Sequence, residues 1–270
     1  ESAEGFGLLS HPCMDTGQRR GRKRRHHTVR GLLMHSSMAL TLDGVPLGLA
    51  AVKFWSRNQF KGCNALKHKI NPTRIPIEEK ESYRWLENIR QSGRLLEVPE
   101  RCVHIGDRES DIYELFCVAA QEKTHFLVRT CVDRLVDDKA VTVAKGMEHP
   151  DGKGRHRIQT QTKDGKACLA LLDISYRRMR LLPPVGKRKK WPGLDLTVIH
   201  AIERGKPAGR EPIRWKLLTD LPVHSVKEAV EKLDWYALRW KIEVFHKILK
   251  SGCRAEDSQL RTSERLVKLI

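Results

Sequence analysis

The sequence predicts an α/β fold in which helices flank a mixed sheet and a β-rich insertion interrupts the order of the strands. Short β-type runs alternate with helical patterns in the order strand, strand, helix, strand, helix, strand, which is typical of a mixed sheet covered by helices. Residues 131–213 then change to Gly-, Lys- and Arg-rich turns between short apolar runs, and a strand is predicted at 214–219. The chain has 270 residues, 40% of them hydrophobic and 31% charged, which is enough to bury a sizeable core.

The first elements of the core are two β-rich runs, at residues 31–42 and 45–55. They are joined by Asp-Gly at 43–44, a dipeptide that favours a tight hairpin turn, so two antiparallel strands are expected. Further on, Pro76 stands at a position typical of a helix start and acidic residues follow it. We expect this helix to end near Gly93.

The next strand ends in a group of charged residues. Residues 101–106 form a short apolar run that leads directly into Asp107, and a helical pattern and a strand at 125–130 follow. Asp107 therefore lies at the carboxyl end of a strand, where open α/β sheets tend to place their sites. The alternative is that Asp107 caps a helix, although Ser110 or Asp111 could provide that cap instead.

A long amphipathic helix is predicted from Ser225 to Lys250, with Gly252 as its stop. Its start reads as a capping box, because Ser225 is followed three residues later by Glu228. At about 100° per residue, one set of polar side chains falls within roughly 80° of the helix circumference. This polar row consists of Tyr236, Arg239, Glu243, Lys247 and Lys250, and the apolar stripe opposite it of Leu238, Ile242, Phe245 and Leu249.

The polar row presents Glu243 among cations and an aromatic hydroxyl. One interpretation is a solvated face, with Arg239-Glu243 and Glu243-Lys247 as ordinary i,i+4 ion pairs. The other is a site for polyanion chemistry, which the basic character of the chain favours.

The net charge favours nucleic acid as the partner. Against 51 Lys and Arg there are 33 Asp and Glu, a formal charge of +18. No apolar run approaches the length of a membrane span and no signal peptide opens the chain, so a membrane partner is not expected. Residues 17–30 are dense in Arg and Lys, and are either a solvated charge run or a segment that contacts phosphates.

The seven cysteines are scattered and include no Cys-x-x-Cys pair, so neither a zinc site nor a disulfide framework is predicted. This usage is typical of a reducing compartment, and we expect most of the thiols to be small buried hydrophobes. The predicted organisation is a basic loop or arm at 1–30, the first part of the core at 31–130, the β-rich insertion at 131–213 and the second part of the core at 214–270.

Asp107 and Glu243 together predict a site for a hard metal ion. Their oxygen ligands suit Mg²⁺ or Mn²⁺, and no set of His and Cys competes for a softer metal. Two such ions about 3.5 to 4 Å apart can activate water or a 3′-hydroxyl at a phosphodiester. A site of this kind normally needs a third carboxylate.

The spacing Tyr236-x2-Arg239-x3-Glu243-x6-Lys250 resembles the YREK signature of bacterial insertion-sequence transposases with a DDE triad, in the insertion-sequence-four class. The resemblance covers nearly all of residues 30–270, including IGDRESDIYELF around Asp107. It implies a ribonuclease H-like core and cut-and-paste cleavage and transfer of DNA. It also implies duplex DNA partners, both transposon ends and target, a homodimer on DNA in the complete protein, and a bacterial cytoplasmic location at the nucleoid.

The resemblance also implies roles for individual residues. Asp107 takes the place of the second aspartate and Glu243 that of the glutamate, both as metal ligands. Tyr236 and Arg239 would hold a DNA phosphate near the cleavage point, and Lys250 would face DNA.

Two further positions match residues of the family that contact DNA. Arg129 matches an arginine that binds transposon-end DNA, and its alternative is a surface cation at a strand end. Trp215 matches a tryptophan that stacks on a base flipped out during hairpin formation, and its alternative is core packing from a strand.

The first aspartate of the triad has no visible counterpart. Asp15 is followed by Thr but lies among polar and basic residues, and Asp43 is explained by the hairpin turn. We therefore expect the first aspartate to lie upstream of residue 1, together with its strand and the amino-terminal DNA-binding region. The chain would then be a fragment that is inactive alone. We also expect its carboxyl-terminal dimerisation helices to be truncated. The alternatives are a DNA-binding remnant without catalysis and a general ribonuclease H-like nuclease or resolvase.

Overall fold

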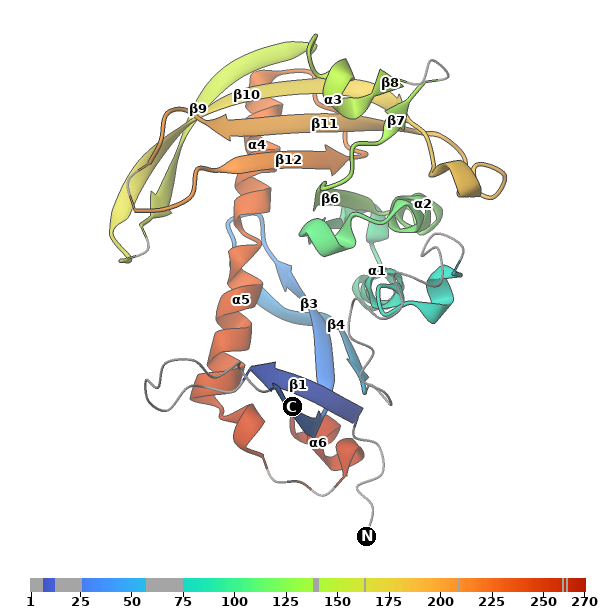
Figure 1. Cartoon of the computed structure of the whole chain (residues 1–270), viewed down its shortest axis with the longest axis vertical. Helices are drawn as coiled ribbons and strands as arrows, with labels where there is room; N and C mark the ends of the chain where they lie inside the picture. The colour runs from blue at the N-terminus through green and yellow to red at the C-terminus, as the bar shows by residue number, and fades with distance from the viewer. Residues whose placement is uncertain are drawn as a thin grey trace.

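The chain folds into sheets flanked by helices, as the predicted α/β class requires (Figure 1). The computed structural model describes residues 7–12, 26–56, 75–137, 141–162, 164–207, 209–258, 260 and 262–270. Most of the arm predicted at residues 1–30 lies outside these residues, and so does Asp15. The described part of the arm consists of two strands that pair with each other, β1 (Gly7–Pro12) and β2 (His26–Gly31). In the part of the chain described, no helix combines the length and apolar character needed to cross a membrane.

The main sheet has eight strands, in the order β5-β6-β12-β11-β10-β7-β8, with β9 paired to β10 outside this path. β5 and β6 are parallel and the other pairs are antiparallel, so the sheet is mixed. The strands predicted for the insertion continue the same sheet instead of forming a second layer. The strands are β5 (Val103–Gly106), β6 (His125–Arg129), β7 (Leu135–Val136), β8 (Val141–Thr142), β9 (Gly152–Gln161), β10 (Ala167–Leu181), β11 (Leu194–Glu203) and β12 (Arg214–Thr219).

The predicted hairpin is confirmed as a separate two-stranded sheet of β3 (Leu33–Leu40) and β4 (Pro46–Trp55). Gly44 has a φ of +80° at the turn, a conformation that side chains with a Cβ rarely adopt. The turn also packs closely against a later helix, because a Cβ at Gly44 would lie 2.8 Å from the Leu238 Cδ2 atom.

The helix predicted to begin at Pro76 begins later than expected, and it ends within one turn of the predicted end near Gly93. Pro76 starts only a short 3₁₀ turn, because the extended backbone of Lys80 breaks the helical run. The helix proper, α1 (Tyr83–Leu96), continues past Gly93 and ends at Glu97, which adopts the left-handed conformation. The helical elements are η2 (Ile77–Glu79), α1, η3 (Pro99–Arg101), η4 (Arg108–Ser110), α2 (Tyr113–Gln121), α3 (Val143–Gly146), η5 (Val185–Lys187), α4 (Val226–Ala237), α5 (Trp240–Lys247), η6 (Ile248–Gly252), η7 (Ala255–Asp257) and α6 (Ser263–Leu269).

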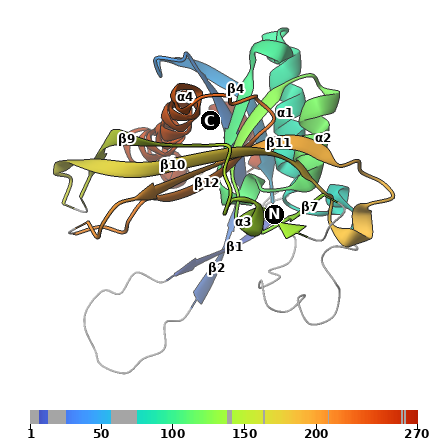
Figure 2. The same cartoon turned by 90° about the horizontal axis from the view of Figure 1, so that it is seen from above.

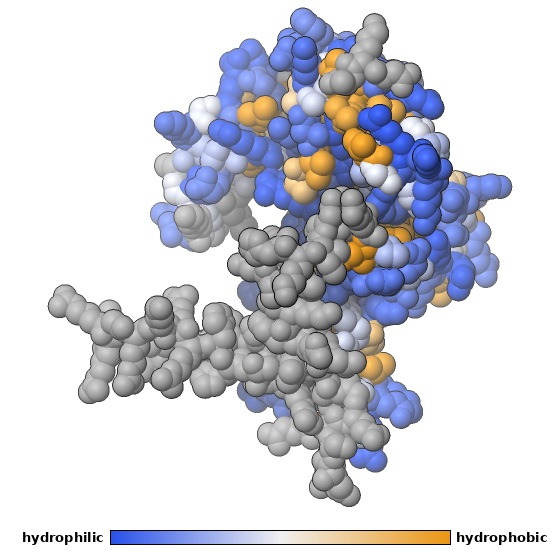
Figure 3. Space-filling model, turned by 45° about the vertical axis from the view of Figure 1, so that its right-hand side comes forward, coloured by the Kyte–Doolittle hydropathy of each residue, from blue (hydrophilic) through white to orange (hydrophobic). Residues whose placement is uncertain are grey.

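The main sheet buries a different face at each of its ends. Figure 2 shows α4 toward one end of the strands and α1 and α2 toward the other. Val198 and Leu218 belong to the cluster that packs under α1 and α2, whereas their neighbours Ile199 and Leu217 belong to the cluster under α4. Since successive side chains of a strand point to opposite faces, the two clusters lie on opposite sides of the sheet. On the face of the molecule seen in Figure 3, apolar residues form small patches on a mainly hydrophilic surface.

The helix predicted at 225–250 is broken into three parts, α4, α5 and the π-helical η6, which follow one another in a single column (Figure 1). Its capping box is confirmed, because the Ser225 hydroxyl accepts a hydrogen bond from the Glu228 backbone N–H at 3.2 Å. Its predicted stop at Gly252 is also confirmed. The apolar stripe is only half-buried, and α5 contains no fully buried residue.

We expect the Ser225→Ala variant to lose about 1 kcal/mol of unfolding free energy, because the cap satisfies a backbone N–H at the start of α4. Urea denaturation followed by circular dichroism measures the change. Lys227→Ala, at an exposed position in the same turn, is the control and should shift stability by less than about 0.5 kcal/mol. Equal effects of the two substitutions would contradict a capping role for Ser225.

The prediction that most cysteines are buried is wrong for the residues described. Of the five cysteines there, all free thiols, only Cys117 is buried, and Cys131 and Cys253 are exposed. Cys13 and Cys63 lie outside the described residues.

Candidate active site

Asp107 follows β5 directly and caps the short turn η4. Its Oδ1 atom accepts a hydrogen bond from the Glu109 backbone N–H at 2.9 Å, so the capping alternative is correct for one carboxylate oxygen. Ser110 and Asp111 could have provided the cap instead, but neither side chain caps α2. Ser110 instead donates to the Asp107 carbonyl at 2.6 Å. The second carboxylate oxygen of Asp107 has no hydrogen-bond partner within the described part of the chain.

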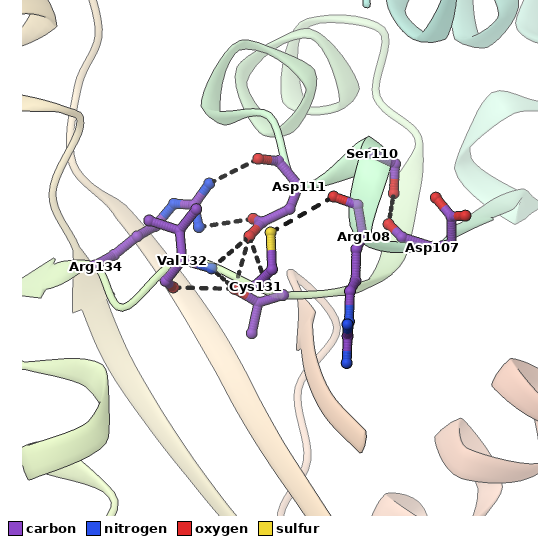
Figure 4. Close-up of polar contacts among 8 residues, drawn as sticks. Asp107, Arg108, Ser110, Asp111, Cys131, Val132 and Arg134 are labelled. Atoms are coloured by element: carbon purple, nitrogen blue, oxygen red, sulfur yellow. Dashed lines mark hydrogen bonds and ion pairs between the residues drawn. The ribbon is translucent and has the colours of Figure 1, made fainter. Parts of the chain in front are cut away.

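Asp111 fixes the turn that begins at Asp107 to the loop after β6 (Figure 4). Its side chain is fully buried, and its Oδ2 atom accepts hydrogen bonds from the Thr130 hydroxyl at 2.9 Å and from the backbone N–H groups of Cys131 and Val132 at 2.8 and 3.0 Å. The Arg134 Nη1 atom forms an ion pair with Oδ1 at 2.7 Å, and the Arg134 Nη2 atom donates a hydrogen bond to the Asp111 carbonyl at 3.1 Å. The residues that follow Asp107 are therefore held in one position.

Glu243 lies on α5, and its side chain is 62% exposed. Its Oε1 atom accepts a hydrogen bond from Arg239 at 2.6 Å, so one of the two predicted i,i+4 pairs forms. Burial alone would lower the pKa of Arg239, but the hydrogen bond to Glu243 and the nearby negative charges, that of Asp107 among them, raise it. The predicted pair between Glu243 and Lys247 is not formed.

Tyr236 does not lie on the exposed polar row, as the helical spacing predicts, but is 4% exposed in the cluster under α4. Its ring packs edge-on against Trp215, with the ring centroids 5.2 Å apart. Burial raises the pKa of Tyr236, the charge of Asp107 adds to the rise, and Arg239 and Arg129 oppose it. Trp215 is half-buried in the same cluster, which is the core-packing arrangement that the sequence left open.

The predicted site residues gather into one group, with one exception. Asp107, from the end of β5, acts electrostatically on both Arg239 and Tyr236, which belong to a segment more than a hundred residues later in the chain. Arg129 reaches the same group from β6, and its Nη2 atom donates to the Arg214 carbonyl at 3.0 Å. Lys250 instead pairs with Glu256 at 2.8 Å, and both side chains are 60% exposed.

Two histidines near the proposed acids, His35 near Asp107 and His246 near Glu243, are not recognised from the sequence. His35, on β3, packs against Trp85 with ring centroids 4.3 Å apart, and burial, Arg84 and His246 lower its pKa to about 4 while Asp107 opposes the shift. His246, on α5, lies 2.9 Å from the Ser36 hydroxyl through its Nε2 atom. His246 follows Glu243 by three residues, a spacing that places two side chains on the same face of a helix. This spacing was the one signal in the sequence that could have placed His246 near Glu243.

Several buried polar atoms have no hydrogen-bond partner where the two sheets approach each other. Trp85 of α1 bridges this region, because it packs against His35 of β3 and lies 3.5 Å from the position that a Cβ of Gly106 would occupy at the end of β5. Buried polar groups are normally paired, so unpaired ones on three adjoining elements need an explanation. The atoms are His35 Nε2 on β3, Trp85 Nε1, Asn88 Oδ1 and Ser92 Oγ on α1, and His104 Nε2 on β5.

We expect acid to destabilise the fold in part through His104, whose pKa burial lowers to about 4. Because the folded-state pKa lies below the unfolded value of 6.5, the unfolded chain binds more protons between these values, and stability falls as the pH drops from 6.5 toward 4. For His104 alone, going from pH 7 to pH 5 should cost about 2 kcal/mol of unfolding free energy. Urea denaturation at the two pH values tests this, and His104→Asn should flatten the pH dependence by that amount. The exposed His149→Asn is the control, and equal flattening in both variants would contradict the assignment.

Among the residues described, no three His, Cys, Asp or Glu side chains lie close enough to hold a metal ion together. Asp107 and Glu243 nevertheless offer carboxylate oxygens, the donor type that Mg²⁺ and Mn²⁺ prefer, and each has an oxygen without a hydrogen-bond partner in this part of the chain. No protein-family model matches the chain.

Proposed function

We propose that this chain carries part of the strand-cleavage and strand-transfer site of a DNA transposase of the DDE type, with Asp107 and Glu243 as two of its three acids. The observation that carries the proposal is the grouping of Asp107 with Arg239, which holds Glu243, although these residues lie far apart in the sequence. A carboxylate at a strand end beside a carboxylate on a helix, with cations around them, suits chemistry on a phosphodiester. The proposed fold of the core is ribonuclease H-like.

The residues present fit a hard divalent metal ion. Asp107 and Glu243 would hold Mg²⁺ or Mn²⁺, two ions in the complete site, which when bound supply Lewis-acid polarisation of a phosphodiester oxygen. Arg239 fixes one oxygen of Glu243, and the cap on η4 fixes one oxygen of Asp107. Each carboxylate therefore keeps a defined orientation and one oxygen for the metal ion.

The cations beside the two acids would bind the DNA backbone. Arg239 and Arg129 both carry positive charge near the Tyr236 hydroxyl, and all three groups can donate hydrogen bonds to phosphate oxygens. Since Tyr236 is held by Trp215 and the core, its hydroxyl is positioned before DNA arrives. Lys250, which pairs with Glu256 at the end of the helical column, would contact DNA farther from the cleaved bond.

A strand that carries the third acid would fit between β3 and β5. Within the described residues β3 pairs only with β4 and β5 only with β6, so each strand has a free edge. Two of the buried polar atoms without a hydrogen-bond partner belong to these strands, His35 Nε2 to β3 and His104 Nε2 to β5. A further strand would pair with the edges, supply hydrogen-bond partners and bring a carboxylate next to Asp107. None of the strands in the described part of the chain takes this position.

A DNA-binding protein without catalytic activity is the second candidate function. It would use the cations around Asp107 to bind DNA and would need no third metal ligand. The net charge of +18 suits either function.

The test is nicking of a supercoiled plasmid in the presence of Mg²⁺ or Mn²⁺, by this chain and by a version extended at its amino end with its natural upstream sequence. Nicking that requires the metal ion in either form supports the transposase assignment, and nicking only in the extended form supports a third acid upstream. Tight DNA binding with no nicking in either form would favour the second candidate.

A further inference from the structure

None of the described helices covers one face of the outer part of the main sheet. Along β9 to β12, alternate side chains pack under α4, and the residues between them point to the opposite side. α1 and α2 cover that opposite side only at the other end of the sheet, and Figure 2 shows the outer strands reaching past these two helices. We call this uncovered surface the open face, and it comprises residues 153, 155 and 157 of β9, residues 171, 173 and 175 of β10, residues 200 and 202 of β11, Arg204, and residues 214 and 216 of β12.

The register of the strands brings the cations of the open face together. Asp173 lies opposite Arg155 on one side and Ile202 on the other, and Ile202 lies opposite Arg214. Neighbouring strands are about 4.8 Å apart and residues on one face of a strand about 7 Å apart, so the charges form a compact array. Its cations are Lys153, Arg155, Arg157, Arg204, Arg214 and Lys216.

One carboxylate stands against these six cations. Asp173 lies 3.3 Å from Arg155 and 2.9 Å from Arg204, so it neutralises part of the array. His200 adds no charge at neutral pH, because burial and the charge of Lys216 lower its pKa to about 4. The remaining cations form no ion pair within the described part of the chain. An exposed array with this excess of positive charge is complementary to a polyanion.

The composition of the open face favours the backbone of a duplex over single-stranded bases. The aromatic residues of these strands, Tyr176 and Trp215, point to the α4 side. The open face has no described Phe, Tyr or Trp on which a base could stack, and its one aromatic ring, that of His200, is half-buried. Stacking is the main means of binding single strands. Cations alone suit the phosphates of a duplex, whose recognition through the backbone is independent of sequence.

We propose that the open face of β9 to β12 binds double-stranded DNA through its phosphates, without sequence preference, as a second contact surface separate from the group around Asp107. The choice of DNA as the duplex rests on the proposed function. Such a surface would hold a stretch of duplex that lies away from the reacting phosphodiester.

The experiment measures binding of the full chain to a labelled duplex of arbitrary sequence over a range of salt concentrations. In one variant Lys153, Arg157 and Lys216 are all changed to Gln, which removes three exposed cations without ion-pair partners. Each lost phosphate contact lowers the slope of log K against log salt by about 0.9, so the slope should fall by about 2 to 3. Binding at 0.1 M salt should weaken by at least about 30-fold. The control changes Arg188, Lys189 and Lys190, three exposed cations in the loop between β10 and β11, to Gln and should bind nearly as the parent does.

A second variant keeps the proposal falsifiable if the triple variant folds poorly. Asp173→Asn removes the one carboxylate of the open face, so binding should become about 3- to 10-fold tighter and more dependent on salt. Equal losses in the triple variant and its control would overturn the proposal, as would weaker binding by Asp173→Asn. A preference for single-stranded DNA, for duplex RNA or for vesicles of anionic lipid over duplex DNA would also overturn it. The nicking test of the proposed function has a separate readout, so its failure would leave these binding results intact.

Discussion

The Asp111→Ala variant should lose about 3 to 5 kcal/mol of unfolding free energy. Asp111 is fully buried, and its carboxylate satisfies one hydroxyl and two backbone N–H groups as well as Arg134. Removing the Asp111 carboxylate leaves the Arg134 guanidinium without a counter-charge, although the Arg134 side chain is only 7% exposed. Removing one partner of a buried ion pair is strongly destabilising. Urea denaturation monitored by circular dichroism measures the loss.

Two further variants separate this effect from a general sensitivity of the region. Glu109→Ala removes a carboxylate that is 67% exposed and pairs with Arg84 at the surface, and should cost less than about 1 kcal/mol. Asp111→Ala combined with Arg134→Met removes both charges and should be less destabilising than the sum of the single changes. A loss below about 1 kcal/mol for Asp111→Ala would show that the network does not hold the turn after Asp107.

Local chemistry made several elements of the fold predictable. The hairpin at Asp43-Gly44, the capping box at Ser225 and the strand at 214–219 each depend on a few neighbouring residues, and each is found as predicted. The mixed α/β class follows from the same local patterns. The sequence did not predict that the strands of the insertion continue the main sheet. The alternation of polar and apolar residues shows which face of a strand is buried, but it does not encode which distant strand pairs with it.

The candidate site was only partly predictable, for a related reason. Helical spacing places Tyr236 in line with Arg239 and Glu243, but it cannot show that the first turn of that row is covered by Trp215 and the core. The break between α4 and α5 lets one end of the polar row be buried and the other exposed. Asp111 was missed because its partners come from a loop about twenty residues away, a contact that no local pattern encodes.

The acid on α5 is the most direct link between this arrangement and the proposed chemistry. Glu243 is exposed and has one hydrogen-bonded partner, Arg239, so replacing its carboxylate by an amide removes little that stabilises the fold. The amide keeps an oxygen that can accept the hydrogen bond from Arg239, but it carries no negative charge for a divalent cation.

We therefore expect Glu243→Gln, in whichever form of the protein nicks DNA, to lower the rate of metal-dependent nicking by about 1,000-fold or more while the urea midpoint changes little. A bound ion stabilises the transition state by several kcal/mol, and about 4 kcal/mol corresponds to a factor of this size. Glu256→Gln, an exposed carboxylate that pairs with Lys250 near the end of the same helical column, is the matched control and should nick at nearly the parent rate. If Glu243→Gln retained the parent rate, Glu243 would not be a metal ligand. Both proposed acids would then have to be sought elsewhere, because the case for Asp107 rests on its position beside Arg239 and Glu243.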